Sequence, residues 1–216
     1  MPIYRKESII SIHIPKTAGL SILEHFGDKS EPYYETFPDI AEYAYIHYTY
    51  NDIKKFCKKT ETYIEGFKIF AIVRNPYDRI VSDFHYFIEK KWISSMNPKY
   101  IINFTDFVEF YILGMHTDKI KLENEVVKRY MFDNHKTPQH KFVINEENCV
   151  APEITIIRFE NLKEELKNKM NIDLNVHINK TTRNKWESYY NKHLEKLVYN
   201  YYFDDFEIFK YDKLII

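Results

Sequence analysis

The stretch from Ser8 to Phe26 constrains the chain most, because it predicts a strand, a loop and a helix in direct succession. Residues 9–14 read IISIHI, a short β-branched apolar run that is typical of a buried strand. Between Leu20 and Phe26, apolar side chains recur at helical spacing, which predicts a helix. The loop between them, residues 15–19, reads PKTAG. The chain must therefore turn sharply out of a buried strand and into a helix N-terminus.

This loop favours binding of an anion. The N–H groups of a first helical turn lack partners within the helix, and the helix dipole favours negative charge beside them. Lys16 adds a positive charge, Thr17 and Ser21 add hydroxyl donors, and Gly19 lets the backbone approach an oxyanion closely. The loop is not a Walker A sequence, because G-x-x-x-x-G-K-[ST] is absent. The alternative is an ordinary β-loop-α turn with a solvated lysine.

A second candidate anion site follows the second clear strand, Phe67 to Val73. Asn75 can cap the next helix, predicted from Pro76 to Lys91, and proline suits its first position. Arg74 leaves the end of this strand, where open α/β sheets place their ligands, and its guanidinium suits phosphate oxygens. Ser82 lies two turns into the helix, off its apolar stripe. Arg79 is expected to be a solvated or ion-paired residue of this helix.

The remaining pattern predicts an α/β fold with a mainly parallel sheet between helices, because strands alternate with helices. A third strand is expected from Glu153 to Phe159, followed by a helix that Asn161 caps and that ends at Met170. A chain of 216 residues suits a single domain, 1–216. We expect a helix that Asn51 or Asp52 caps and that ends at Lys59, and a helix that Thr105 caps. The other expected elements are helices at residues 121–132, 187–202 and 204–211, and loops at 27–38, 92–103, 133–140 and 179–185.

Charge and cysteine content exclude several classes of protein. The net charge of −1 gives no reason to expect a nucleic-acid-binding surface. The two cysteines, Cys57 and Cys149, form no metal pattern or disulfide framework, and we expect free thiols. No apolar run is long enough to span a membrane, and residues 1–6 lack the apolar centre of a signal peptide. We therefore expect a soluble, cytoplasmic protein, with no membrane span and of unknown oligomeric state.

The sequence Pro15-Lys16-Thr17-Ala18-Gly19-Leu20-Ser21 closely resembles the 5′-phosphosulfate loop of sulfotransferases that use 3′-phosphoadenosine 5′-phosphosulfate (PAPS), especially the carbohydrate type. Leu20 departs from that pattern, because a threonine is common there. Residues 74–82, RNPYDRIVS, are similar to the 3′-phosphate site of the same family. Segments 137–140, 157–162 and 177–211 add further likeness. The resemblance is strong at the two binding motifs and weak from 92 to 132.

The resemblance implies a P-loop-like three-layer domain, with a mainly helical acceptor-side insertion at about 92–140. It implies that a sulfuryl group moves in line from PAPS to an acceptor hydroxyl on a carbohydrate, without a metal, leaving adenosine 3′,5′-bisphosphate. Lys16 would stabilise the leaving oxygen. The 5′ end and the 3′-phosphate would be bound by these residues: Lys16, Thr17, Ala18, Gly19, Leu20 and Ser21 for the former, Arg74 and Ser82 for the latter. A loop of Lys180, Thr181, Thr182 and Arg183 would cover the donor, or would be a solvated surface loop.

The resemblance also places a catalytic histidine between the two binding motifs, where His47 lies. Histidine side chains titrate near neutral pH, which suits a general base. A packed or surface histidine is the alternative for His47, and His13, within the first strand, is expected to have a core role. The other candidates are weaker. They are His135, Gln139 and His140 as contacts to acceptor or donor, with a structural role in their loop as an equal alternative, and Glu24 or Asp83 as the base.

Two other functions remain open at this point. The first is a P-loop-like nucleotide kinase or phosphotransferase, which the missing Walker A pattern and the lack of an evident Mg²⁺ carboxylate disfavour. The second is a degenerate module that binds PAPS without catalysis, which Leu20 suggests. Residues 33–50 and 104–132 are expected to line an acceptor cleft, since exposed aromatic rings can stack on sugars, although packing in the core explains most of these aromatic residues equally well.

Overall fold

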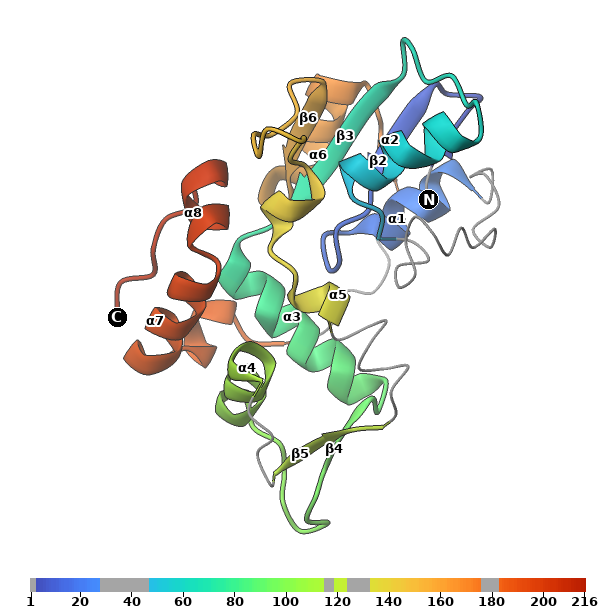
Figure 1. Cartoon of the computed structure of the whole chain (residues 1–216). Coiled ribbons are helices and arrows are strands. Elements are labelled where there is room, and N and C mark those ends of the chain that lie inside the picture. Colours follow the sequence, from blue (N-terminus) through green and yellow to red (C-terminus); the bar gives the residue numbers. More distant parts are fainter. Residues whose placement is uncertain (1–2, 28–46, 115–118, 124–132, 176–182) are drawn as a thin grey trace. The chain divides into compact units, whose positions relative to one another are not determined.

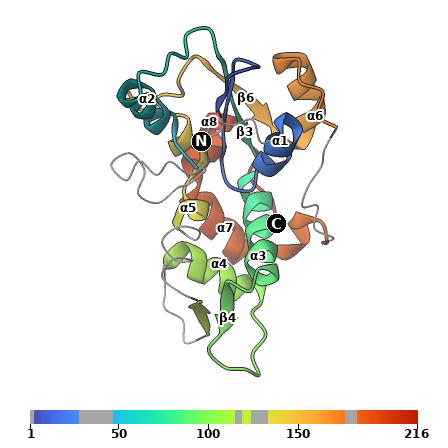
Figure 2. The same ribbon diagram turned by 90° about the vertical axis from the view of Figure 1, so that its right-hand side faces the viewer.

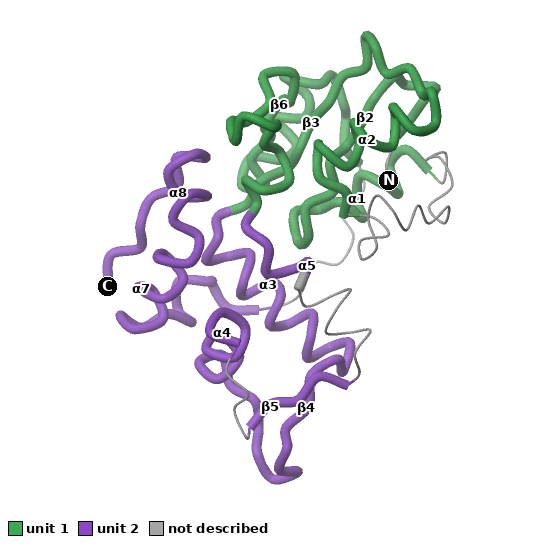
Figure 3. The backbone as a smooth tube through the Cα atoms, viewed as in Figure 1, with its two compact units in different colours: residues 1–74, 139–180 green, residues 75–138, 181–216 purple. Residues whose placement is uncertain are grey.

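The computed structural model describes residues 3–27, 47–114, 119–123, 133–175 and 183–216 (Figure 1). The chain divides into two compact units, coloured separately in Figure 3. The first unit holds residues 1–74 and 139–180, and the second holds residues 75–138 and 181–216. A single functional domain over 1–216, with an insertion at about 92–140, stays a prediction.

The first unit is built on a four-stranded sheet with the order β1-β2-β3-β6. Strands β2 (Ile9–Ile12), β3 (Lys68–Val73) and β6 (Ile154–Arg158) are parallel, whereas the short β1 (Ile3–Tyr4) is antiparallel to β2. This confirms the expected mainly parallel sheet. The carboxyl ends of β2, β3 and β6 therefore lie at one edge, the edge at which open α/β sheets bind ligands.

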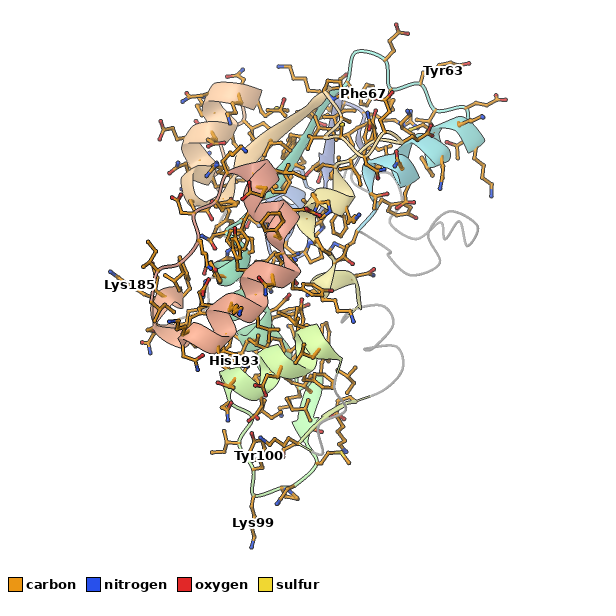
Figure 4. The ribbon with its side chains drawn as sticks, turned by 60° about the vertical axis from the view of Figure 1, so that its left-hand side comes forward. Tyr63, Phe67, Lys99, Tyr100, Lys185 and His193 are labelled. Carbon is orange, nitrogen blue, oxygen red and sulfur yellow. The ribbon has the colours of Figure 1, made fainter. Side chains whose placement is uncertain are left out.

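Helices cover both faces of this sheet, as Figure 2 shows. Helices α1 (Gly19–Phe26) and α6 (Leu162–Glu165) lie on one face, and α2 (Tyr50–Lys59) lies on the other. Ile22, Phe70 and Leu166 belong to the apolar core between the sheet and the first of these layers. Alternate residues of a strand face opposite sides, so a buried sheet of this kind needs apolar residues throughout its strands. On the connection between α2 and β3, Tyr63 points outward and is 85% exposed (Figure 4).

The second unit is mainly helical and has its own aromatic core. Its long helix α3 (Pro76–Glu89) begins where the sequence predicted, with the Asn75 side chain accepting a hydrogen bond from the N–H of Tyr77. Its core includes Tyr77, Phe87, Phe107 and Phe206. The other described elements are α4 (Phe104–Leu113), α5 (Asp133–Lys136), α7 (Lys192–Tyr201), α8 (Phe203–Phe209), and the antiparallel strands β4 (Ile93–Ser95) and β5 (Ile120–Leu122).

Several element predictions were wrong. Strands β4 and β5 replace a predicted loop at 92–103 and the start of the helix predicted at 121–132, because each strand pairs with a partner distant in sequence. The predicted loop at 133–140 contains α5 and the start of the 3₁₀ turn Gln139–Phe142. After Asn161, which makes no side-chain cap hydrogen bond, α6 is short and continues as a π turn, Leu166–Met170.

Helix starts were also displaced where two candidate caps stood close together. Thr49, rather than Asn51 or Asp52, caps α2 and forms a capping box with Asp52. Asn103, rather than Thr105, caps α4. At the C-terminal end, the 3₁₀ turn Trp186–Tyr189 precedes α7, which Asn191 caps, so the predicted helix from 187 begins later. In the loop between β4 and α4, Lys99 points outward (Figure 4), whereas the ring centroid of Tyr100 lies 5.8 Å from Lys119 Nζ.

The sequence predicted that Arg79 is a solvated or ion-paired residue of α3. Arg79 is not solvated, because it is almost completely buried within the second unit. Its Nη2 donates to the carbonyl oxygen of Thr137 at 2.9 Å, and its guanidinium carbon lies 5.2 Å from the ring centroid of Tyr202. Burial alone lowers the pKa of Arg79, but the negative groups around it, Asp205 and Asp83 among them, raise it overall. The guanidinium therefore stays charged inside the core.

Candidate functional site

The loop between β2 and α1 has the backbone of an anion-binding turn. Lys16 and Ala18 both take the left-handed conformation, with φ values of 65° and 71°, which is unfavourable for residues other than glycine. Such residues are found at functional sites and in the backbone nests that bind anions. Ala18 is the N-cap of α1 and makes no side-chain cap hydrogen bond. The N-cap residue of α1 therefore contributes only its backbone to the first turn of the helix.

The side chains of this loop and of the first turn of α1 differ in burial. Thr17 is buried, and its hydroxyl donates to the carbonyl oxygen of Ile14 at 2.9 Å. Thr17 thus uses its hydroxyl proton inside the loop. Ser21 is buried in the first turn of α1, and Leu20, where the resembled family often has threonine, is 40% exposed. Lys16 is half-buried.

Arg74 joins the second motif to this loop. It follows β3 directly and is 7% exposed. Its Nη1 donates to the carbonyl oxygen of Lys16 at 2.9 Å, and its guanidinium carbon lies 4.0 Å from the ring centroid of Phe159, the residue that follows β6. The two motifs, separated by 58 positions, thus meet at the carboxyl edge of the parallel strands.

Gln139 holds the backbone of Arg74 in place. Its Oε1 accepts the Arg74 N–H at 2.9 Å, and its Nε2 donates to the Arg74 carbonyl oxygen at 2.8 Å. Gln139 is completely buried, so this pairing replaces hydrogen bonds to water where β3 ends. The sequence left open whether Gln139 contacts acceptor or donor or has a structural role in its loop, and its pairing with the Arg74 backbone is of the structural kind. No local pattern shows which backbone a buried amide will pair with.

His47 lies at the same edge of the sheet, three residues before α2. Its Nδ1 lies 2.8 Å from the carbonyl oxygen of His13, and its side chain is buried within the first unit. A carbonyl oxygen can only accept, so Nδ1 carries the proton, and in a neutral ring Nε2 then bears the lone pair. This is the tautomer that a general base requires.

His13 is buried, as expected, but it does not lie in a purely apolar core. Its ring centroid is 4.6 Å from that of His47, with the ring planes at 67°. A methyl group placed on Gly19 would overlap the His13 ring. The absence of a side chain at Gly19 therefore lets the His13 ring lie close to the loop backbone. The sequence alone did not reveal this contact.

The other residues that are predicted to bind the sulfuryl donor lie in the second unit or outside the described residues. Ser82 lies on α3 in the second unit, one turn after Asp78 and one turn before His85. Arg183 forms an ion pair with Asp78. Burial lowers the pKa of His85, and the positive charge of Arg183 lowers it further. Arg183 and Ser82 thus lie near one face of α3. Lys180, Thr181 and Thr182 lie outside the described residues.

The weaker base candidates have other surroundings. Asp83 is completely buried and accepts hydrogen bonds from the Tyr111 hydroxyl and from His135 Nδ1, each at 2.7 Å. It belongs to the core of the second unit. Glu24 is exposed on α1, and His140 is buried after Gln139. In the described part of the chain, no three His, Cys, Asp or Glu side chains are grouped to hold a metal, and no helix is long and apolar enough to cross a membrane.

Comparison with known proteins gives one match. A sequence model described as the sulfotransferase family matches residues 2–212, which is nearly the whole chain. Neither a curated protein nor a solved structure matches the chain. The match covers both binding motifs, and the mainly parallel sheet flanked by helices is consistent with an α/β sulfotransferase. The chain belongs to the sulfotransferase family, whose members transfer sulfuryl groups.

Proposed function

We propose that this protein transfers the sulfuryl group of PAPS to an acceptor hydroxyl on a carbohydrate, with His47 as the general base. The observation that carries the proposal is the meeting of three groups within the first unit. The phosphosulfate-type loop, Arg74 and the correctly tautomeric His47 lie together at the carboxyl edge of the sheet. The family match supports sulfuryl transfer in general, and the loop sequence supports PAPS as donor.

The residues of the loop fit a phosphosulfate group. Two left-handed residues, Lys16 and Ala18, and the first turn of α1 supply backbone N–H groups of the kind that bind oxyanions. For the 3′-phosphate we keep the residues that the family resemblance implies, Arg74 and Ser82. The loop of Lys180, Thr181, Thr182 and Arg183 remains the proposed cover of the donor.

PAPS, when bound, supplies a sulfuryl group whose bond to a phosphate oxygen breaks while a bond from the acceptor oxygen to sulfur forms. His47 Nε2 accepts the proton of the acceptor hydroxyl, and its Nδ1–H stays on the His13 carbonyl. The ammonium of Lys16 stabilises the negative charge that develops on the leaving phosphate oxygen. Adenosine 3′,5′-bisphosphate is the second product.

Transfer of ³⁵S from labelled PAPS to a panel of glycans tests the proposal, with three variants beside the wild type. His47→Ala and Lys16→Ala should each lower kcat by about 10²-fold or more. His25→Ala, on the exposed side of α1, is the matched control and should retain kcat within about twofold. Undiminished transfer by Lys16→Ala would refute the mechanism.

A thermal-shift comparison separates the proposal from its alternatives. Adenosine 3′,5′-bisphosphate should raise the melting temperature of the wild type, because a ligand that binds only the folded state stabilises it. Stabilisation by ATP–Mg²⁺ but not by the bisphosphate would favour a kinase instead. Binding of the bisphosphate without transfer to any acceptor would favour a degenerate binding module.

A further inference from the structure

We propose that His13 is a positioning residue, which fixes the ring of His47 against the donor loop. This inference rests on the proposed function, in which His47 is the base. Three contacts made by one residue carry it. The His13 carbonyl oxygen binds His47 Nδ1 at 2.8 Å, the two rings lie edge to face at 4.6 Å, and the His13 ring lies against the backbone of Gly19.

The first two contacts determine different properties of His47. The hydrogen bond to the carbonyl oxygen selects the tautomer, because it keeps the proton on Nδ1. That bond restrains the position of Nδ1 more than the tilt of the His47 ring plane. The edge-to-face contact with the His13 ring restricts this tilt, since aromatic rings have preferred packing geometries. The direction of the Nε2 lone pair therefore depends on the His13 ring.

The third contact links this arrangement to the donor loop. Gly19 is the first residue of α1 and the last residue of the loop, and its φ angle is not in the left-handed region. Backbone conformation therefore does not require glycine there. Space does, because a Cβ atom at position 19 would overlap three atoms of the His13 imidazole. The base and the N–H groups of the loop are thus aligned through one buried ring.

Two substitutions test the ring itself. His13→Ala removes the ring, and we expect kcat to fall by about 10- to 100-fold, because small misplacements of a catalytic group are this harmful. Affinity for adenosine 3′,5′-bisphosphate should change by less than about threefold, since the backbone N–H groups of the loop remain. His13→Phe keeps a planar ring and should retain at least about a third of kcat. His25→Phe, on α1, is the matched control. Activity of His13→Phe as low as that of His13→Ala would overturn the proposal.

Gly19→Ala supplies a second, independent test. Alone, its methyl group should displace the His13 ring and lower kcat about as much as His13→Ala does. In the double variant, His13→Ala with Gly19→Ala, the imidazole ring that the methyl group would displace is absent. The kcat of the double variant should therefore be no lower than that of His13→Ala alone. Substitutions that act through one contact are non-additive. If the two losses multiply instead, Gly19 and His13 act separately and the proposal is wrong.

NMR of labelled protein reads the tautomer and the ring contact directly and does not need a turnover assay. In the wild type and in all three variants, His47 should carry its proton on Nδ1, because each keeps the His13 carbonyl oxygen. Nuclear Overhauser contacts between the rings at positions 13 and 47 should be present in the wild type and in His13→Phe, and should weaken in Gly19→Ala, whose methyl group displaces the His13 ring. If the ring contacts follow this pattern while no sulfuryl transfer occurs, the proposed function fails and the positioning role stands. Unchanged ring contacts in Gly19→Ala together with an unchanged kcat in His13→Ala overturn the positioning role alone.

Discussion

Replacing Gln139 with leucine should destabilise the sheet of the first unit. Its amide pairs with both backbone groups of Arg74, at 2.9 Å and 2.8 Å, and is completely buried. Leucine has similar size but cannot pair with either group. A buried backbone group left without a partner costs about 1–3 kcal/mol, so two such groups give a loss of about 2–4 kcal/mol after partial relaxation. This is a large part of the stability of an ordinary domain.

Urea unfolding followed by circular dichroism measures this loss. The matched control is Asn145→Ala, because the Asn145 side chain also makes two hydrogen bonds to backbone N–H groups, those of Glu147 and Cys149, but in an exposed turn. Water can replace those bonds, so the control should change the free energy of unfolding by less than about 1 kcal/mol. Equal unfolding midpoints for the two variants would refute the reasoning that burial makes the Gln139 pairing important.

Three further outcomes are expected. Leu20→Thr should strengthen adenosine 3′,5′-bisphosphate binding by about three- to tenfold in calorimetry, because it adds a hydroxyl donor at an exposed loop position; weaker binding would contradict this. Tyr111→Phe should lower the free energy of unfolding by about 1–2 kcal/mol in urea, because it removes a buried hydrogen bond to Asp83. Burial of Glu165 opposes its ionisation, but a hydrogen bond from Lys169 and one from a backbone N–H outweigh burial and lower its pKa. The contribution of ionised Glu165 to the free energy of unfolding is therefore complete above the unfolded-state pKa and is lost as pH falls through the folded-state pKa. Glu165→Gln removes this titrating group, so it should reduce the dependence of the melting temperature on acid pH.

The sequence by itself determined the elements whose signals are local. The β-branched run of β2 and the apolar run of β3 predicted buried strands, and Asn75 with Pro76 predicted the start of α3. The loop sequence from Pro15 to Ser21 identified the family, which the match over residues 2–212 shows. These signals are readable because periodicity, capping and turn chemistry involve residues only a few positions apart.

Tertiary structure decided what depends on residues far apart in the chain. Gln139 pairs with a backbone 65 positions away, and His47 takes its tautomer from a carbonyl oxygen 34 positions away. Arg79 is buried because the second unit closes around it. No local pattern encodes these contacts, since each depends on which two segments the packed core brings together. The sequence thus named Lys16, Arg74 and His47 as candidate residues, and only the fold revealed that Arg74 bonds to the Lys16 carbonyl oxygen and that the His13 ring lies against Gly19 and His47.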